Sequence, residues 1–223
     1  MNTAQLLGTG IIGISCLALI GYTSYDVIYW IYQWFKTKLS CWNYQQQGLD
    51  FWPSQSSYHS HQTPLYITSP FGQLASILNH CGSINNKTLI DCGCGKGNIL
   101  IEANQFPFKA LAGIDIDPDL IKICYQNINH CDMTSKTTLY TGSLQEHESI
   151  IASYDIIYCY GVYQETALRS LCTYLATQKT AKQVIYRNLT DPTPFYETGF
   201  QLQYHHHNCN LADYEIWVFA INT

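Results

Sequence analysis

Residues 89–103, LIDCGCGKGNILIEA, constrain the fold more than any other stretch of the chain. An apolar run ends in an acid, Asp91, and glycines follow at positions 93, 95 and 97 before an apolar pattern with helical spacing begins. Glycines in such a loop allow the backbone to approach a ligand closely and to adopt positive φ. Because loops at the carboxyl ends of parallel strands form the ligand sites of open α/β sheets, this stretch predicts a binding site.

The alternation of strand and helix patterns continues to the end of the chain and predicts a parallel sheet covered by helices on both faces. The last two strands are joined by a short polar connection without a helix, so we expect an antiparallel pair to close the sheet. Expected strands cover 87–92, 110–116, 137–142, 154–161, 181–188, 200–208 and 214–222, and expected helices cover 69–81, with a Ser cap and Pro70 in the first turn, 97–106, 118–128 and 165–176.

The N-terminal part of the chain has the character of a membrane segment. No charged side chain occurs from Met1 to Tyr25, and residues 6–22 are almost wholly apolar. Spanning a bilayer takes about 20 apolar residues, whereas a cleaved signal peptide would need a basic start and a small-residue cleavage site. We therefore expect a transmembrane anchor and juxtamembrane segment over 1–38, a linker over 39–62 and the α/β domain over 63–223.

Charge composition limits the partners and the location of the chain. Lys36 and Lys38 follow the apolar run directly, and this predicts a single-pass membrane protein whose C-terminal domain is cytoplasmic. The eleven Lys and Arg residues are scattered and the net charge is −5, so we expect no nucleic acid partner. Ten cysteines without regular spacing predict free buried thiols in a reducing compartment.

The residues around the glycine loop favour a nucleoside cofactor. Asp115 ends the next expected strand, 18 residues after Gly97, where a carboxylate can accept hydrogen bonds from both hydroxyls of a ribose. Dinucleotides and S-adenosylmethionine both meet this requirement. Three features favour S-adenosylmethionine: the G-x-G-x-G spacing, the closing antiparallel pair, and Asp91, whose carboxylate would attract the ammonium group of a methionine tail.

The stretches IDCGCGKGNILIEA and AGIDIDPDLIKICYQNI together resemble motif I and the following acidic motif of class I S-adenosylmethionine-dependent methyltransferases. The resemblance covers roughly residues 63–223 and implies a seven-stranded Rossmann-like sheet, mostly parallel with an antiparallel last strand. Together with the N-terminal apolar segment and PLYITSP at 64–70, the arrangement is similar to membrane-anchored enzymes of the ATP synthase c-subunit lysine methyltransferase-like group.

The resemblance implies roles for individual residues. The methionine end of the cofactor would lie against Asp91 and the three glycines of the loop, the ribose against Asp115, and the acceptor against the catalytic candidate Tyr160, for which a plain buried sheet aromatic is the alternative. The expected cofactor-binding set is Tyr66 and Ser69 as a lid over the methionine end, Asp91, Gly93, Gly95, Gly97, Asp115, Ile116 packed on the adenine, and Gly142 and Ser143 at the adenine edge.

The chain departs from the family pattern at two places. Gly142-Ser143 stands where many relatives have Gly-Asp, and this weakens the expected contact with the adenine amino group. YCYGVYQE at 158–165 lacks the N-P-P-[YF] of amino-group methyltransferases, and this leaves the methyl acceptor open. A protein lysine or a membrane-associated substrate remains possible by resemblance. A non-catalytic S-adenosylmethionine-binding membrane protein and a nucleotide-dependent oxidoreductase are the alternative functions.

Other residues that suggest chemistry have simpler interpretations, and no metal site is expected. Cys92 and Cys94 occupy the small variable positions of the glycine loop. The histidines of HHHNC, 205–209, cannot all converge on a metal because consecutive side chains of a strand point to opposite faces. Asp117 and Asp119 are expected to cap the helix that follows them.

Overall fold

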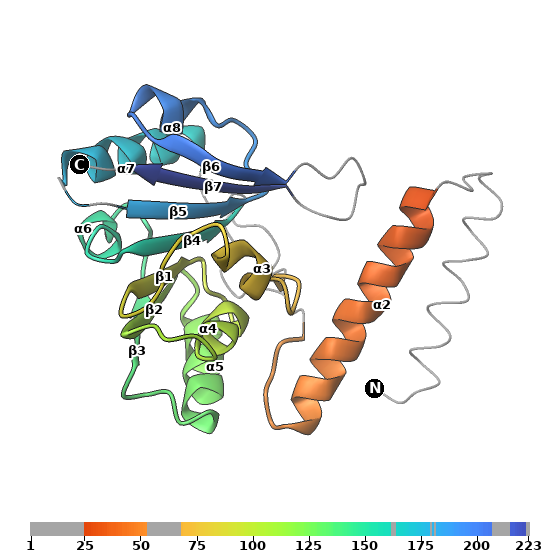
Figure 1. Ribbon diagram of the computed structural model, residues 1–223. Coiled ribbons are helices and arrows are strands. Elements are labelled where there is room, and N and C mark those ends of the chain that lie inside the picture. The colour runs from red at the N-terminus through yellow and green to blue at the C-terminus, as the bar shows by residue number, and fades with distance from the viewer. Residues whose placement is uncertain are drawn as a thin grey trace.

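A computed structural model of the chain describes residues 25–52, 68–161, 164–178, 180, 182–206 and 215–221. Its centre is a seven-stranded sheet in the order β3-β2-β1-β4-β5-β7-β6 (Figure 1). The first five strands pair in parallel, and β7 runs antiparallel to both of its neighbours, β5 and β6. The strands are β1 (Thr88–Cys92), β2 (Ala110–Asp115), β3 (Thr137–Thr141), β4 (Ile156–Tyr160), β5 (Lys182–Arg187), β6 (Gln201–His206) and β7 (Ile216–Ile221).

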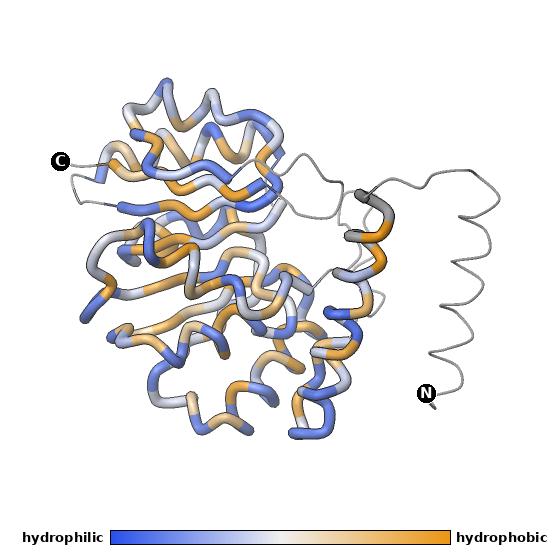
Figure 2. Tube along the Cα trace, turned by 45° about the vertical axis from the view of Figure 1, so that its right-hand side comes forward, coloured by the Kyte–Doolittle hydropathy of each residue, from blue (hydrophilic) through white to orange (hydrophobic). Residues whose placement is uncertain are grey.

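Helices cover both faces of the sheet because its central strands are buried on both sides. One apolar core joins the sheet to α3 (Leu74–Leu78), α4 (Asn98–Ala103) and α5 (Pro118–His130). The second core, on the opposite face, joins it to α6 (Glu148–Ile151), α7 (Glu165–Thr177) and α8 (Thr193–Glu197). Figure 2 shows the resulting pattern, with hydrophobic strands inside and hydrophilic segments toward the outside. The predicted strands and the closing antiparallel pair are confirmed.

The start of α3 differs from the prediction. A helix from Ser69 with a serine cap was expected, but α3 begins at Leu74 and its N-cap residue, Gln73, makes no side-chain cap bond. The carboxylate of Glu102 on α4 instead accepts hydrogen bonds from the N–H groups of Gly72 and Leu74, at 2.7 and 3.4 Å. The carboxylate of Glu102 thus takes the place of the predicted serine cap. Two further short helices, α6 and α8, were not predicted.

A long helix, α2 (Tyr25–Gln46), precedes the sheet and extends past the predicted boundary at residue 38. The segment that follows it was expected to begin a polar linker, but Leu49 and Phe51 are buried with Cys41 and Phe71 in a small core against the sheet domain. Leu49 and Phe51 are apolar residues within this mostly polar segment, and their burial holds the segment against the domain. Residues 53–67 lie outside the described part of the chain.

In the part of the chain that the structure describes, no helix combines the length and the apolar character needed to cross a bilayer. The predicted anchor rests mainly on residues 1–24, which lie outside the described residues. The described helix α2 has a row of exposed apolar side chains that recur every three or four residues, on one side of the helix. They are Ile28, Tyr32, Phe35, Leu39 and Trp42.

Candidate functional site

The glycine loop leaves the carboxyl end of β1 and leads into α4. Gly93, Gly95 and Gly97 all have positive φ, a conformation in which only glycine is free of strain. At Gly97 a second constraint applies, because a Cβ atom there would lie 2.6 Å from Sγ of Cys124. The loop therefore presents bare backbone at the edge of the sheet, as the sequence predicted.

Asp115 at the end of β2 holds this loop in place. Its Oδ2 accepts a hydrogen bond from the N–H of Gly95 at 2.8 Å, and its Oδ1 accepts one from the N–H of Asp117 at 2.9 Å. Each carboxylate oxygen has a second lone pair, so both can still accept a hydrogen bond from a ligand hydroxyl. Asp115 is thus a loop-ordering residue as well as the predicted ribose acceptor.

Asp91 and Asp115 form a pair of buried carboxylates at the ends of adjacent strands. Burial, and after it the charge of Asp115, raises the pKa of Asp91 well above its usual range. Burial also raises the pKa of Asp115, although the N–H groups of Asp117 and Gly95 favour its charged form. A cationic group placed beside this pair would relieve the cost of ionising it.

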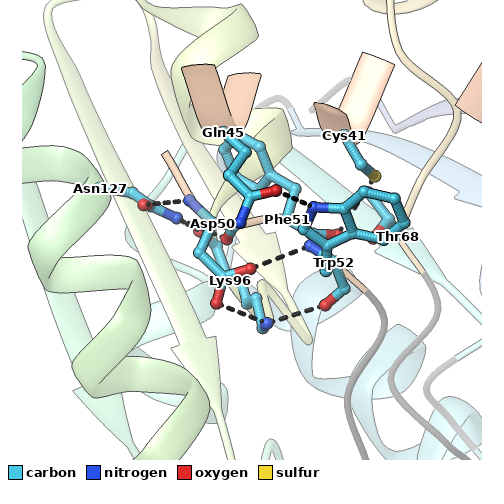
Figure 3. Close-up of polar contacts among 8 residues, drawn as sticks. All are labelled: Cys41, Gln45, Asp50, Phe51, Trp52, Thr68, Lys96 and Asn127. Atoms are coloured by element: carbon cyan, nitrogen blue, oxygen red, sulfur yellow. Dashed lines mark hydrogen bonds and ion pairs between the residues drawn. The ribbon is translucent and has the colours of Figure 1, made fainter. Parts of the chain in front are cut away.

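A segment far from the loop in sequence secures it from outside (Figure 3). The ammonium of Lys96 donates to Oδ2 of Asp50 at 2.9 Å and to the carbonyl of Trp52 at 2.8 Å. Asn127 on α5 accepts from the N–H of Asp50 and donates to the carbonyls of Asp50 and Lys96. We call residues 50–52 the strap, and sequence reasoning missed it.

The predicted lid residues divide between described and undescribed parts of the chain. Tyr66 lies outside the described residues. Ser69 is buried, and its carbonyl accepts a hydrogen bond at 2.9 Å from the side chain of Asn98, the first residue of α4. Ser69 therefore lies beside the end of the glycine loop, and its contact with a cofactor stays a prediction.

The end of β3 brings an acid to the predicted adenine edge. The N–H of Gly142 donates to the carbonyl of Asp115 at 3.0 Å, while the N–H and hydroxyl of Ser143 both donate to Oε2 of Glu146. These bonds lower the pKa of Glu146. Glu146 thus supplies a carboxylate close to position 143, where many relatives have aspartate. Ile116, the residue that directly follows β2, is half-buried.

The carboxyl ends of β4 and β5 lie on the other side of the glycine loop from β2 and β3. Tyr160 is the last residue of β4, and the guanidinium carbon of Arg187 lies 5.7 Å from the centroid of its ring. Tyr158 lies next to Asp91 in the strand register and is fully buried, which raises its pKa to about 12. The predicted role of Tyr160 toward an acceptor remains a prediction, and Arg187 was not predicted.

The secondary candidates have structural roles. Asp117 caps α5 by accepting from the N–H groups of Asp119 and Leu120, as predicted. His205 stacks on Trp217 while His206 points to the other face of the sheet. Within the described residues, no group of three His, Cys, Asp or Glu side chains could hold a metal ion. All eight described cysteines are free thiols.

Comparison with known proteins gives a family match over residues 84–201, described as a methyltransferase domain. The chain is 29% identical over 134 residues to the small RNA 2'-O-methyltransferase of Arabidopsis thaliana, and this alignment covers 56% of the chain and 14% of that protein. It is 37% identical over 65 residues to the ribosomal protein L11 methyltransferase of Yersinia pseudotuberculosis, over 29% of the chain and 22% of that protein.

The fold is also similar to that of the magnesium protoporphyrin IX methyltransferase of Synechocystis, solved with bound S-adenosylmethionine. The two structures align with a TM-score of 0.52 and 18% identity, over 68% of this chain and 77% of that one. The chain spans less than a quarter of the length of the two sequence relatives.

Proposed function

The chain belongs to the methyltransferase domain family, and from this premise we propose that it transfers a methyl group from S-adenosylmethionine to an acceptor at the carboxyl edge of its sheet. The chain is an S-adenosylmethionine-dependent methyltransferase, and S-adenosylmethionine is its cofactor. The observation that carries the proposal is the pair of buried acids, Asp91 and Asp115, around a glycine loop with positive φ.

The residues present fit this cofactor. A methionine ammonium beside Asp91 would compensate a buried carboxylate whose ionisation is otherwise unfavourable. Asp115 retains free lone pairs for the ribose hydroxyls, and Glu146 with Gly142 and Ser143 would meet the adenine edge. A dinucleotide would instead bring phosphate charges toward the two acids.

The cofactor supplies a methyl group that its sulfonium charge already activates. The chain therefore has to orient the acceptor for in-line attack and to exclude water. Tyr160 at the end of β4 would border the acceptor, because β4 adjoins the strand that carries the glycine loop. No nucleophilic side chain of the enzyme is required.

The acceptor class is a separate question. The names of the two sequence relatives refer to small RNA and to a ribosomal protein, and that of the structural neighbour to a porphyrin. The name of the first relative therefore leaves a nucleic acid acceptor open, contrary to the expectation from charge. Membership of the lysine methyltransferase-like group stays a prediction from motifs. The absence of a basic stripe favours a small or protein acceptor over RNA.

Two measurements test the proposal on the full-length chain in detergent. Calorimetric titration should show binding of S-adenosylmethionine and S-adenosylhomocysteine and none of NAD. Incubation with tritiated-methyl cofactor and cell extract, sorted into protein, lipid, RNA and small-molecule fractions, should label one fraction. Binding of NAD alone would instead support an oxidoreductase, and cofactor binding without transfer would support a non-catalytic binding protein.

We also propose that the N-terminal region associates with a membrane and leaves the catalytic domain in the cytoplasm. The support is the uncharged run to Tyr25, the basic Lys36 and Lys38 after it, and the exposed apolar row on α2. The row would continue the apolar surface of the preceding run toward the bilayer interface.

A further inference from the structure

The exposed apolar row of α2 lies on the side of the helix that faces away from the sheet domain. At about 100° per residue, its five positions fall within about 80° of the helix circumference, and their side chains are between 40% and 66% exposed. On the opposite side of the helix, Cys41 is fully buried in the small core with Phe51. Within the described part of the chain, the row is therefore an uncovered apolar surface.

Two lysines border this row, one on each side. By the same helical geometry, Lys36 and Lys38 lie about 80° to either side of the centre of the row. They are the only charged residues from Val27 to Leu49. A one-sided apolar row that contains aromatic side chains and is bordered by cations is typical of helices that lie along a membrane surface. Because both charges are positive, the pattern favours an anionic lipid surface.

A second copy of the chain is the alternative occupant of the row, since its alternating spacing of four and three residues is also that of a coiled-coil seam. Helix pairs of that kind use opposite charges beside the seam. Two copies of α2 would instead bring lysines together, with no acid between Val27 and Leu49 to pair with them. The uncharged residues 1–24 lead directly into α2. Both observations favour lipid over a second copy.

The strap attaches the C-terminal end of α2 to the candidate site (Figure 3). The indole N–H of Trp52 donates to Oε1 of Gln45 at 2.8 Å, and the centroid of its ring lies 5.0 Å from Nζ of Lys38. The carbonyl of the same Trp52 accepts from the ammonium of Lys96 in the glycine loop. One residue of the strap therefore contacts the basic border of the row, the last turns of α2 and the loop.

We propose that α2 lies along the surface of an anionic membrane, with its apolar row among the acyl chains and with Lys36 and Lys38 at the phosphate groups. Because the strap joins this helix to the glycine loop, the same contact holds the candidate site at the membrane surface. The inference rests on the membrane association proposed above and goes beyond it in the placement of α2 and in the charge of the lipid.

Depth-dependent fluorescence quenching tests this placement on the full-length chain in lipid nanodiscs. A thiol-reactive fluorophore is attached at Leu39→Cys in the row and, as the matched control, at Tyr125→Cys on α5, because the native side chains are 59% and 58% exposed. The chain without an added cysteine gives the background signal.

The expected result follows from the depth of an interfacial helix. Its apolar face is buried about 5–10 Å at the boundary between headgroups and acyl chains. In discs of phosphatidylcholine and phosphatidylglycerol at roughly three to one, a nitroxide near the headgroup should quench position 39 about twofold more strongly than a nitroxide at the bilayer centre. Neither nitroxide should quench position 125.

The role of the two lysines is tested with a double variant. Each lysine near an anionic surface contributes a factor of about five to the binding equilibrium. Lys36→Gln with Lys38→Gln should therefore lower the quenching at position 39 about twofold or more, and pure phosphatidylcholine discs should have a similar effect on wild type. Lys109→Gln with Lys122→Gln, at two exposed positions of the sheet domain, matches the charge change and should leave the quenching unchanged. Equal quenching in both double variants would overturn the anionic surface.

The remaining outcomes are distinguishable. Stronger quenching of position 39 from the bilayer centre would show that the row enters the bilayer core and would overturn the surface placement. No quenching by either nitroxide would mean that protein covers the row, and would also overturn it. Separation of the chain from the discs in gel filtration would refute the membrane association itself. Failure to bind S-adenosylhomocysteine in the same discs would instead refute the proposed methyl transfer.

Discussion

The ammonium nitrogen of Lys96 lies 2.9 Å from Oδ2 of Asp50, although 46 positions separate the two residues in the chain. The Lys96 side chain is 2% exposed and that of Asp50 is 49% exposed. The pair therefore attaches a segment that precedes the sheet domain to the middle of the glycine loop. Because the loop is the predicted cofactor site, we expect the strap to help hold that site in place.

Replacing Asp50 by Asn should weaken this attachment. It leaves the buried ammonium of Lys96 with the carbonyl of Trp52 but without its carboxylate. Removal of one partner of a fully buried pair costs about 3–5 kcal/mol, and the exposure of Asp50 reduces this, so we expect a loss of roughly 1–3 kcal/mol in the free energy of unfolding. Urea denaturation measures it. Glu165→Gln, in an exposed pair with Arg169, is the control and should change stability little; an equal effect of both variants would refute a special role for the strap.

Replacing Asp115 by Ala should reduce cofactor affinity. Hydrogen bonds to charged groups contribute about 1.5–3 kcal/mol each, so S-adenosylhomocysteine should bind roughly tenfold to several hundredfold more weakly in calorimetry. Asp117→Ala is the matched control. It removes the cap of α5, which should lower stability by about 1 kcal/mol and affect affinity much less. Similar affinity losses in both variants would mean that Asp115 acts only by ordering the loop.

The raised pKa of Asp91 predicts opposite pH effects on stability and on binding. An acid whose pKa is higher in the folded state than in the unfolded state stabilises the fold when protonated. This contribution is present below the ordinary value of 3.8 and is lost as pH rises through the raised value. We therefore expect Asp91→Asn to increase the stability of the cofactor-free chain at pH 8, as measured by thermal unfolding.

Cofactor affinity should show the reverse dependence, because the ammonium of S-adenosylhomocysteine favours the ionised form of Asp91. Affinity of the wild type should rise with pH as Asp91 loses its proton, and the Asp91→Asn variant should bind more weakly with a flatter profile. Calorimetry at several pH values between 5 and 8 measures both. An unchanged profile in the variant would show that Asp91 does not contact the ammonium.

Membrane association should depend on the N-terminal apolar run. The full chain should sediment with membranes and resist extraction by alkaline carbonate, because about 20 apolar residues suffice to span a bilayer. A reporter fused after Thr223 should behave as cytoplasmic, and the domain should be protected from protease added outside intact cells. Recovery of the full chain in the carbonate supernatant would contradict the anchor, while cleavage by external protease would contradict the orientation alone.

Much of the fold and half of the site could be predicted from the sequence because their signals are local. Apolar runs predicted the strands of the sheet, and Asp91, Asp115 and the three glycines of the loop lie where the motif indicated. Asp117 caps its helix because an N-cap contacts residues only two or three positions away. The narrower family group and the role of Tyr160 remain predictions.

The α/β order and the position of the glycine loop follow from the amino-acid sequence, since periodicity and spacing record how each short segment is buried. The pairing of distant side chains follows from the folded arrangement: Asp50 with Lys96, Glu102 with the start of α3, and Arg187 with Gln73, 114 positions apart. A single polar residue carries no local pattern that specifies its partner. Its partner is chosen by the packing of helices and strands around it.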